Sequence, residues 1–428
     1  MKKLLLVMFL VVIAGTLIFA GGRQDSGNNI TMWMQNYGDD LPRQTRMMNE
    51  LAADFQRETG IRVEVEIGNW TEASTKWMLV ATGGAHPDVG DMWWAWSNSQ
   101  IGRGRHGPMA LNEHISRLNH QNFVPASLQD VLFQGDVYGV PWRIDVRPLV
   151  YRHDLFQEAG IAAPPDTWQD LVDYGRRLTT RAADGRIDIS GIGLGYGVAN
   201  DSQDFCHWMW QGGGEAMTPD GRTATLNTQY VIDAMQFVRD LVYVHEVVTM
   251  DVLDPTYHGP NLFISGKSAI RPMGGSGTSD FPPEFLARVR ASIPTIGVRR
   301  TAYSGAGYMG VLHGTRNVEA SIQWLEFLSR DENMLRLAIM SEQFSPSIGA
   351  SADAYFANDE WSRQVIRCLE FAKTSQSPSA AWSQIAGRSP GSPLYDFWAD
   401  VLLNREPISV LANRYNAQAQ TMMDRASH

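Results

Sequence analysis

The chain has 428 residues, of which 44% are hydrophobic and only 19% charged, so it holds enough apolar material for two cores and we expect two domains. Its net charge of -10 argues against nucleic acid or an anionic membrane surface as a partner, because both attract basic patches. The chain also contains 14 tryptophans, well above ordinary usage.

The N-terminus has the pattern of an export signal. Two lysines precede an uncharged stretch, residues 4–22, whose apolar core ends in small residues. This is typical of a secretory signal peptide, which we place at residues 1–20. An uncleaved anchor is the alternative, because the stretch is just long enough to span a bilayer. No cysteine lies near its end to be acylated, so we expect a secreted, periplasmic protein.

The next segments alternate between strand and helix patterns. Residues 30–34 alternate apolar and polar as a half-buried strand does, and a polar loop, residues 35–38, follows. Apolar residues at helical spacing predict a helix that Gly60 ends, and residues 61–67 alternate again as a strand. Strand, helix and strand in this order indicate a right-handed parallel crossover.

A second crossover of the same kind follows. We expect a helix over residues 71–82 and an apolar strand after Pro87 that runs into a tryptophan cluster. Ligands of open α/β sheets bind outside the carboxyl ends of the strands. The candidate ligand contacts at these ends are Gln35, Asn36, Trp70, Trp94 and Trp96.

The middle of the chain supplies the polar candidates. A strand that ends at Pro141 is predicted to open into a loop that exposes Trp142, Arg143, Asp145 and Arg147. An ionised side chain can hold two adjacent hydroxyls with charge-assisted hydrogen bonds, so Asp145 and Arg143 are the favoured ligand contacts. A structural salt bridge is the alternative for both.

Three further patterns concern local structure. Thr167 begins a helix with the Thr-x-x-Asp capping arrangement. Trp208 and Trp210 alternate like residues of a strand, and we expect Trp208 to reach the ligand. Cys368 lies on an apolar helix face and is expected to be buried. A disulfide between Cys368 and Cys206 is the alternative.

Residues 137–156 and 164–168 resemble the most recognisable segment of the family 1 extracellular solute-binding proteins, the sugar-capturing subunits of bacterial ABC importers related to maltose-binding protein. Residues 263–277, 304–311 and 317–328 resemble further landmarks of that family. The resemblance implies an α/β, two-lobed periplasmic binding protein fold of type II, with hinge-connected lobes that are each a mixed sheet flanked by helices. It places lobe 1 at residues 28–141 and 305–345, and lobe 2 at residues 142–304 and 346–428.

The resemblance also implies ligand contacts. Trp142 and Trp382 resemble positions where family members stack on sugar, and the glycine-rich end of the strand near residue 273 is expected to face the ligand. For any one tryptophan, burial in the core is the alternative. The remaining candidates are Gly274, Gly275, Ser276, Gly307 and Tyr308.

These patterns together predict a binding protein. Sugars offer apolar C–H faces and hydroxyls, which aromatic and paired polar side chains satisfy. No catalytic, metal or nucleotide pattern is found, so we expect no enzyme, metal or cofactor, but a monomer that captures a carbohydrate and delivers it to ABC permease subunits with an associated ATPase. Two other ligands are the alternatives: glycerol phosphate esters, whose phosphate Arg143, Arg147 and Arg271 could bind, and polyamines. Delivery to a chemoreceptor and an exported glycoside hydrolase are the alternative functions.

Overall fold

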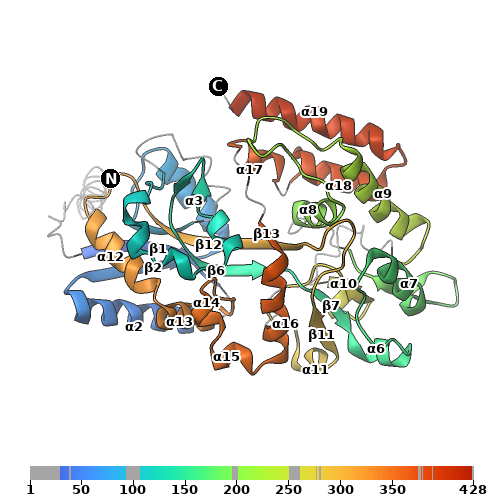
Figure 1. Cartoon of the computed structure of the whole chain (residues 1–428), viewed down its shortest axis with the longest axis horizontal. Helices are drawn as coiled ribbons and strands as arrows, with labels where there is room; N and C mark the ends of the chain where they lie inside the picture. The colour runs from blue at the N-terminus through green and yellow to red at the C-terminus, as the bar shows by residue number, and fades with distance from the viewer. Residues whose placement is uncertain are drawn as a thin grey trace, which may run out of the picture.

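The computed structural model has two halves, joined by long central strands (Figure 1). The predicted signal peptide lies outside the described residues. The structure describes residues 29–37, 40–92, 107–194, 201–249, 261–275, 277–278, 281–374, 377, 379–387 and 389–426. Within these residues no helix has both the length and the apolar character to cross a membrane.

The first half is built on a six-stranded sheet in the order β13-β12-β3-β1-β2, with β6 paired to β12. The parallel pairing predicted for both crossovers is confirmed, because β1 pairs in parallel with β2 and with β3. Helix α2 ends where predicted, since Gly60 adopts a positive φ of 77° that closes the helix. The strands are β1 Asn29–Gln35, β2 Arg62–Gly68, β3 Val89–Met92, β6 Val140–Val146, β12 Ala302–Val311 and β13 Ala372–Thr374, and the helices are α2 Leu41–Thr59, α3 Trp70–Ala81, α12 Val318–Leu328 and α13 Asp331–Ser341.

The second half is built on a five-stranded sheet in the order β11-β7-β10-β9-β8. The predicted cap of α7 is confirmed: the Thr167 side chain accepts from the Asp170 backbone N–H, and the Asp170 carboxylate accepts from the Thr167 N–H. The strands are β7 Leu149–Arg152, β8 Thr180–Arg181, β9 Ile187–Ile192, β10 Ser268–Arg271 and β11 Val289–Ser292, and the helices are α6 His153–Glu158, α7 Trp168–Leu178, α10 Asn261–Ile264 and α11 Pro283–Leu286.

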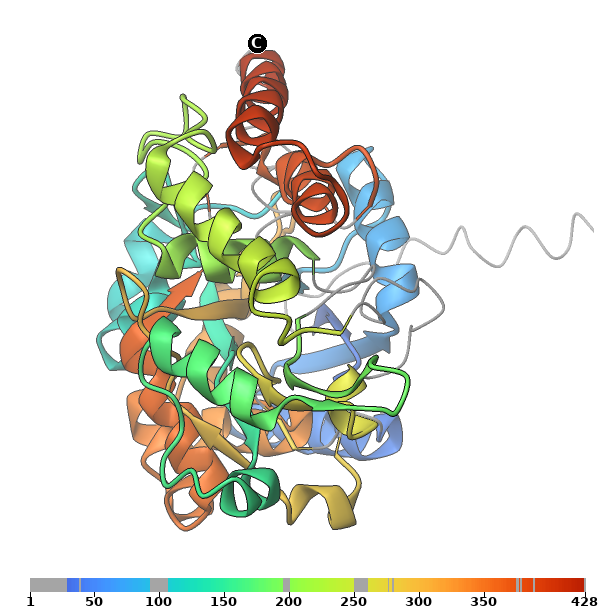
Figure 2. The same ribbon diagram turned by 90° about the vertical axis from the view of Figure 1, so that its right-hand side faces the viewer.

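A helical layer covers the second half (Figure 2). It consists of α8 Asp201–Gln211, α9 Gln229–Tyr243, α18 Pro393–Leu403 and α19 Ile408–Ala426. The buried Arg239 of α9 donates to the carbonyls of Val401 at 3.0 Å, Asp400 at 3.1 Å and Glu406 at 2.6 Å. Because the last carbonyls of a helix have no partner within it, Arg239 caps α18 from outside.

The two halves share a third apolar cluster beneath the central strands. It includes Ile144 and Val146 of β6, Ala338 of α13, Phe344 and Val365. The remaining elements are η1 Asn112–Arg117, η2 His120–Asn122, α5 Pro125–Gln129, β4 Leu132–Phe133, β5 Asp136–Val137, α14 Ile348–Ser351, α15 Ala354–Ala357, α16 Glu360–Cys368, η4 Leu369–Phe371 and α17 Trp382–Ile385.

Two sequence-based predictions are settled by the fold. Cys206 and Cys368 are both free and buried, so the disulfide alternative is wrong, and the expected burial of Cys368 is confirmed. Trp208 and Trp210 do not lie on a strand but on helix α8, where both are buried. Trp208 packs against Trp168 and Phe237, which explains why this aromatic segment is internal.

Candidate functional site

Strand β6 carries a row of charged side chains where the two halves meet. Arg143, Asp145 and Arg147 lie on one face and are partly exposed, whereas Trp142 and Ile144 alternate with them and are fully buried. The Arg147 guanidinium lies 2.7 Å from the Asp145 carboxylate. The predicted loop after Pro141 is therefore wrong: these residues form a strand, and its period of two separates the polar row from the core.

Two glycines of β12 face this row. In the antiparallel register Gly305 lies opposite Asp145, and Gly307 opposite Arg143. A side chain at Gly307 would place its Cβ 2.6 Å from the Arg143 Nε, so Arg143 lies across the glycine. A Cβ at Gly305 would meet nothing within 4 Å. The space over Gly305 is therefore open, with Asp145 beside it.

Asp91 of β3 anchors the neighbourhood of Arg143. Its fully buried carboxylate accepts from the Trp142 indole N–H at 2.8 Å and from the Tyr37 hydroxyl at 2.9 Å. The Gln35 backbone N–H donates to it at 3.4 Å. The ring of Tyr37 in turn lies 4.4 Å from the Arg143 guanidinium carbon, in a cation–π contact. We call Tyr37, Asp91, Trp142 and Arg143 the Asp91 cluster.

The electrostatics of the Asp91 cluster are balanced. Burial tends to lower the pKa of Arg143, but Tyr37, Asp91 and Asp145 outweigh it, so its pKa is raised and the guanidinium stays charged. Burial raises the pKa of Asp91. The charge of Arg143 and the hydrogen bonds donated by Trp142 and Tyr37 act in the opposite direction, toward a lower pKa. Burial raises the pKa of Asp130 well above its usual value, although Thr374, Ala306 and Arg143 oppose this.

Helix α8 faces the same row from the second half. Arg147 donates to the Gln203 side chain at 3.4 Å, and Trp210 stacks on Tyr303 of β12 with ring centroids 5.6 Å apart. His207 is fully buried, its Nδ1 has no hydrogen-bond partner, and burial lowers its pKa to about 3. The polar row therefore lies between elements of both halves.

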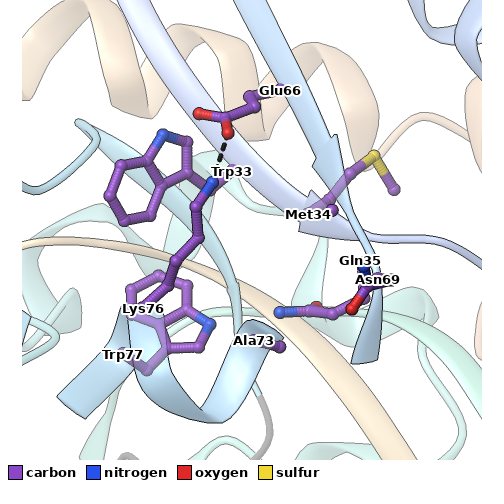
Figure 3. A pocket seen from close by; sticks show the side chains of 9 residues that line it. Trp33, Met34, Gln35, Glu66, Asn69, Ala73, Lys76 and Trp77 are labelled. Atoms are coloured by element: carbon purple, nitrogen blue, oxygen red, sulfur yellow. Dashed lines mark hydrogen bonds and ion pairs between the residues drawn. The ribbon is translucent and has the colours of Figure 1, made fainter. Parts of the chain in front are cut away.

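A small pocket lies at the carboxyl ends of β1 and β2, beside α3 (Figure 3). It is narrow and is walled by Trp33 and Trp77, whose rings meet edge to face at 5.9 Å. Lys76 lies 4.6 Å above the Trp33 ring and forms an ion pair with Glu66, as the dashed line shows. The cation is thus already satisfied by an aromatic face and a carboxylate.

Part of the predicted site is brought together by the structure. Gln35, Arg143, Asp145 and Gly307 gather around the Asp91 cluster and the open space over Gly305. The neighbouring residue Asn36 has a buried side-chain oxygen with no partner. Two further candidates lie at the start of β7: the Gly274 N–H donates to the Pro148 carbonyl at 2.7 Å, and Gly275 follows it, partly exposed.

Four other candidates lie in the core, against the expectation of exposed side chains. Trp142 is enclosed because its indole bonds to Asp91. Trp208 and Trp382 belong to the core of the second half, and Tyr308 of the first-half sheet is buried as well. None of these aromatic faces is open to a ligand in this structure. The candidates Trp94, Trp96, Ser276 and the Trp70 side chain lie outside the described residues.

Sequence reasoning missed Tyr37, Asp91 and Gly305 as parts of the site. Asp91 carried a signal, since an acid inside the short apolar strand β3 must find partners in the core. The importance of Gly305 depends on its register with Asp145, which no local pattern reveals. In the described part of the chain, no three His, Cys, Asp or Glu side chains cluster closely enough to hold a metal ion.

Most of the chain matches a known protein family. A family model described as bacterial extracellular solute-binding protein matches residues 39–335. The arabinooligosaccharide-binding protein of Halalkalibacterium halodurans is 25% identical over 143 residues, which are 33% of this chain and 30% of that protein. Matches to the first curated relatives span only 30% to 54% of those relatives' lengths.

Solved structures match nearly the whole chain. The sugar-binding protein MalE of Xanthomonas citri has a TM-score of 0.79 at 17% identity, covering 93% of this chain and 98% of that one. UgpB of Mycobacterium tuberculosis, in complex with glycerophosphocholine, has a TM-score of 0.71 at 17% identity, covering 94% and 99%. At such identities the likeness shows the fold, which is the two-lobed α/β fold of periplasmic binding proteins, as predicted.

Proposed function

This chain belongs to the bacterial extracellular solute-binding proteins, and from that premise we propose that it captures a carbohydrate between its two lobes and delivers it to a membrane permease of the ABC type. The observation that carries the proposal is the open space over Gly305, which lies beside Asp145 where the two halves meet. The predicted division into lobe 1 and lobe 2 is part of this proposal.

The chemistry of the polar row suits hydroxyl groups. A carboxylate accepts from two hydroxyls and a guanidinium donates to two, so the neighbouring Asp145 and Arg143 complement a ring bearing adjacent hydroxyls. Because Gly305 has no side chain, an apolar sugar face can lie close to the backbone of β12 there. Asn36 adds a buried carbonyl oxygen without a partner, which a hydroxyl could satisfy.

Capture would work by a shift of population between open and closed forms. A solute that touches β6 and β12 on one side and α8 on the other makes all its contacts only when the lobes are closed. Its binding energy therefore favours the closed form, which a permease with its ATPase distinguishes from the empty protein. We propose that the protein acts as a periplasmic monomer after removal of residues 1–20.

A glycerol phosphate ester is the second candidate, favoured by the structural likeness to UgpB and by the pair Arg143 and Arg147. Arg147 is already paired with Asp145, and the charges of Asp91 and Asp145 act on Arg143, so an added phosphate would meet a balanced site. Polyamines are positively charged, so their site would need more carboxylates than cations. Here Arg143 and Arg147 offset the charges of the carboxylates. The charge balance therefore supports the carbohydrate.

A thermal-shift screen of the protein from residue 21 onward tests this proposal. Neutral mono- and oligosaccharides, glycerol phosphate esters and polyamines would each be added, and the chemical state of any stabilising compound checked afterwards. A ligand at a hundred times its dissociation constant stabilises the fold by about 2.7 kcal/mol, a readily seen rise in melting temperature. A rise only with phosphate esters or amines overturns the carbohydrate, and cleavage of a sugar indicates a hydrolase.

A further inference from the structure

The Asp91 cluster suggests a residue that controls selectivity without touching the solute. We infer that Asp91 is a positioning and specificity-determining residue: it fixes and neutralises Arg143, so that the site selects neutral hydroxylated solutes over their phosphate esters. This inference rests on the proposed function and deepens it.

Asp91 has the geometry of an ionised anchor. Its carboxylate is fully buried, and it receives the Trp142 indole, the Tyr37 hydroxyl and the Gln35 backbone N–H. An indole and a backbone amide can only donate, so the group facing them must accept. Three donors and a nearby guanidinium together stabilise a carboxylate in a place where an unpaired charge would be costly.

The anchor fixes Arg143 from two directions. Trp142 precedes Arg143 on β6, and its indole N–H donates to Asp91, so the carboxylate holds the residue next to Arg143 in place. The Tyr37 hydroxyl is held by the same carboxylate, and its ring lies 4.4 Å from the guanidinium. On the other side Arg143 lies across Gly307, where a Cβ would be 2.6 Å from Nε. Arg143 is thus confined between an aromatic ring and a glycine.

The same carboxylate sets the net charge that a solute meets. Arg143 and Arg147 supply two positive charges, and Asp91 and Asp145 supply two negative ones. A neutral solute can exchange hydrogen bonds with this set without leaving a charge unpaired. A phosphate ester adds two negative charges beside two carboxylates, and such like-charge juxtaposition is a common means of rejecting wrong partners.

The decisive variant is Asp91→Asn, which keeps the shape and removes the charge. One amide oxygen can still accept from Trp142, the Tyr37 hydroxyl can rotate to accept from the new amide nitrogen, and the long 3.4 Å bond from the Gln35 backbone N–H is lost. Dissociation constants would be measured by calorimetry for two matched pairs, D-tagatose with its 6-phosphate and glycerol with glycerol 3-phosphate. We expect the preference for the neutral member to fall by about tenfold or more, the effect of removing one nearby charge.

Two controls separate this role from a merely structural one. Asp154→Asn removes an equal charge at the Arg152 ion pair, away from the Asp91 cluster, and should leave the preference unchanged. In an Arg143→Met background, Asp91→Asn should no longer shift the preference, because the effect passes through Arg143; such a double-mutant cycle isolates the coupling. Equal melting temperatures before and after Asp91→Asn exclude unfolding as the cause.

The outcomes are distinguishable. If the unaltered protein binds a neutral sugar but Asp91→Asn leaves its preference over the phosphate unchanged, the inference about Asp91 is wrong and the proposed function stands. The inference is also wrong if the shift persists without Arg143. If the unaltered protein binds no neutral compound in any screen, the proposed carbohydrate itself is wrong.

Discussion

The two glycines that face the polar row give the sharpest test of where the solute lies. A Cβ at Gly305 meets nothing within 4 Å, and its φ lies outside the left-handed region, so neither a clash nor backbone strain opposes a larger residue. Gly305→Ala should therefore keep the stability, or raise it by about 0.4–1 kcal/mol because alanine lowers the entropy of the unfolded chain. Gly305→Leu should also fold, with its side chain in the open space.

Binding should respond in the opposite way. A leucine over Gly305 occupies the volume beside Asp145, so a sugar would lose one or two charge-assisted hydrogen bonds. Each is worth about 1.5–3 kcal/mol, which corresponds to a loss of affinity of about a hundredfold for the leucine variant. The alanine variant should lose less. Affinity would be measured by calorimetry and stability by thermal unfolding, for the whole size series.

Gly307→Ala provides the matched comparison on the same strand face. Its Cβ would come within 2.6 Å of the Arg143 Nε, so the guanidinium must move, and we expect a loss of stability of about 1–3 kcal/mol from overpacking. The two glycines are therefore distinguished by stability: Gly305→Leu should lose affinity without losing stability, whereas Gly307→Ala should lose stability, and affinity as well where Arg143 contacts the solute. Unchanged affinity in a folded Gly305→Leu variant refutes the placement of the solute.

Three other predictions follow from buried polar groups. Arg239→Met removes the guanidinium that caps α18 and leaves its carbonyls without that donor, which should cost about 3 kcal/mol in chemical denaturation. Burial lowers the pKa of His207 from 6.5 to about 3, so the unfolded chain takes up a proton in this range before the folded one does; stability should fall as the pH drops below 6.5, by about 2 kcal/mol at pH 5. Unfolding curves of His207→Gln between pH 7 and 4 should lack this loss, whereas those of the exposed His313→Gln should keep it. Burial raises the pKa of both thiols, so Cys206 and Cys368 should resist alkylation until the chain unfolds, which mass spectrometry can follow; rapid labelling of the folded protein contradicts their burial.

Local patterns predicted much of the fold. The strand predicted at residues 30–34, the helix that ends at Gly60 and the capped helix after Thr167 all depend on short-range rules of alternation and capping, and the structure confirms all three, with the strand at Asn29–Gln35. The resemblance to solute-binding proteins added the two-lobed architecture, which the structural likenesses confirm.

The errors share a physical cause in long-range contacts. The alternation in residues 142–147 was visible, yet the burial of Trp142 depends on Asp91, which lies 51 positions earlier in the chain. The burial of Trp208 similarly depends on packing against Trp168 and Phe237, which lie far from it in the sequence. The aromatic residues expected to stack on a sugar fill the core instead. The charged row of β6 lies where the two halves meet, as a binding site between them requires.

The most direct test is native mass spectrometry of the protein from residue 21 onward, incubated with an equimolar mixture of neutral sugars, glycerol phosphate esters and polyamines. We predict one bound compound with the mass of an intact neutral carbohydrate, and its loss from the Gly305→Leu variant. A bound phosphate ester or polyamine, a sugar recovered as fragments, or a carbohydrate that the Gly305→Leu variant still retains would each contradict capture of a carbohydrate between β6, β12 and α8.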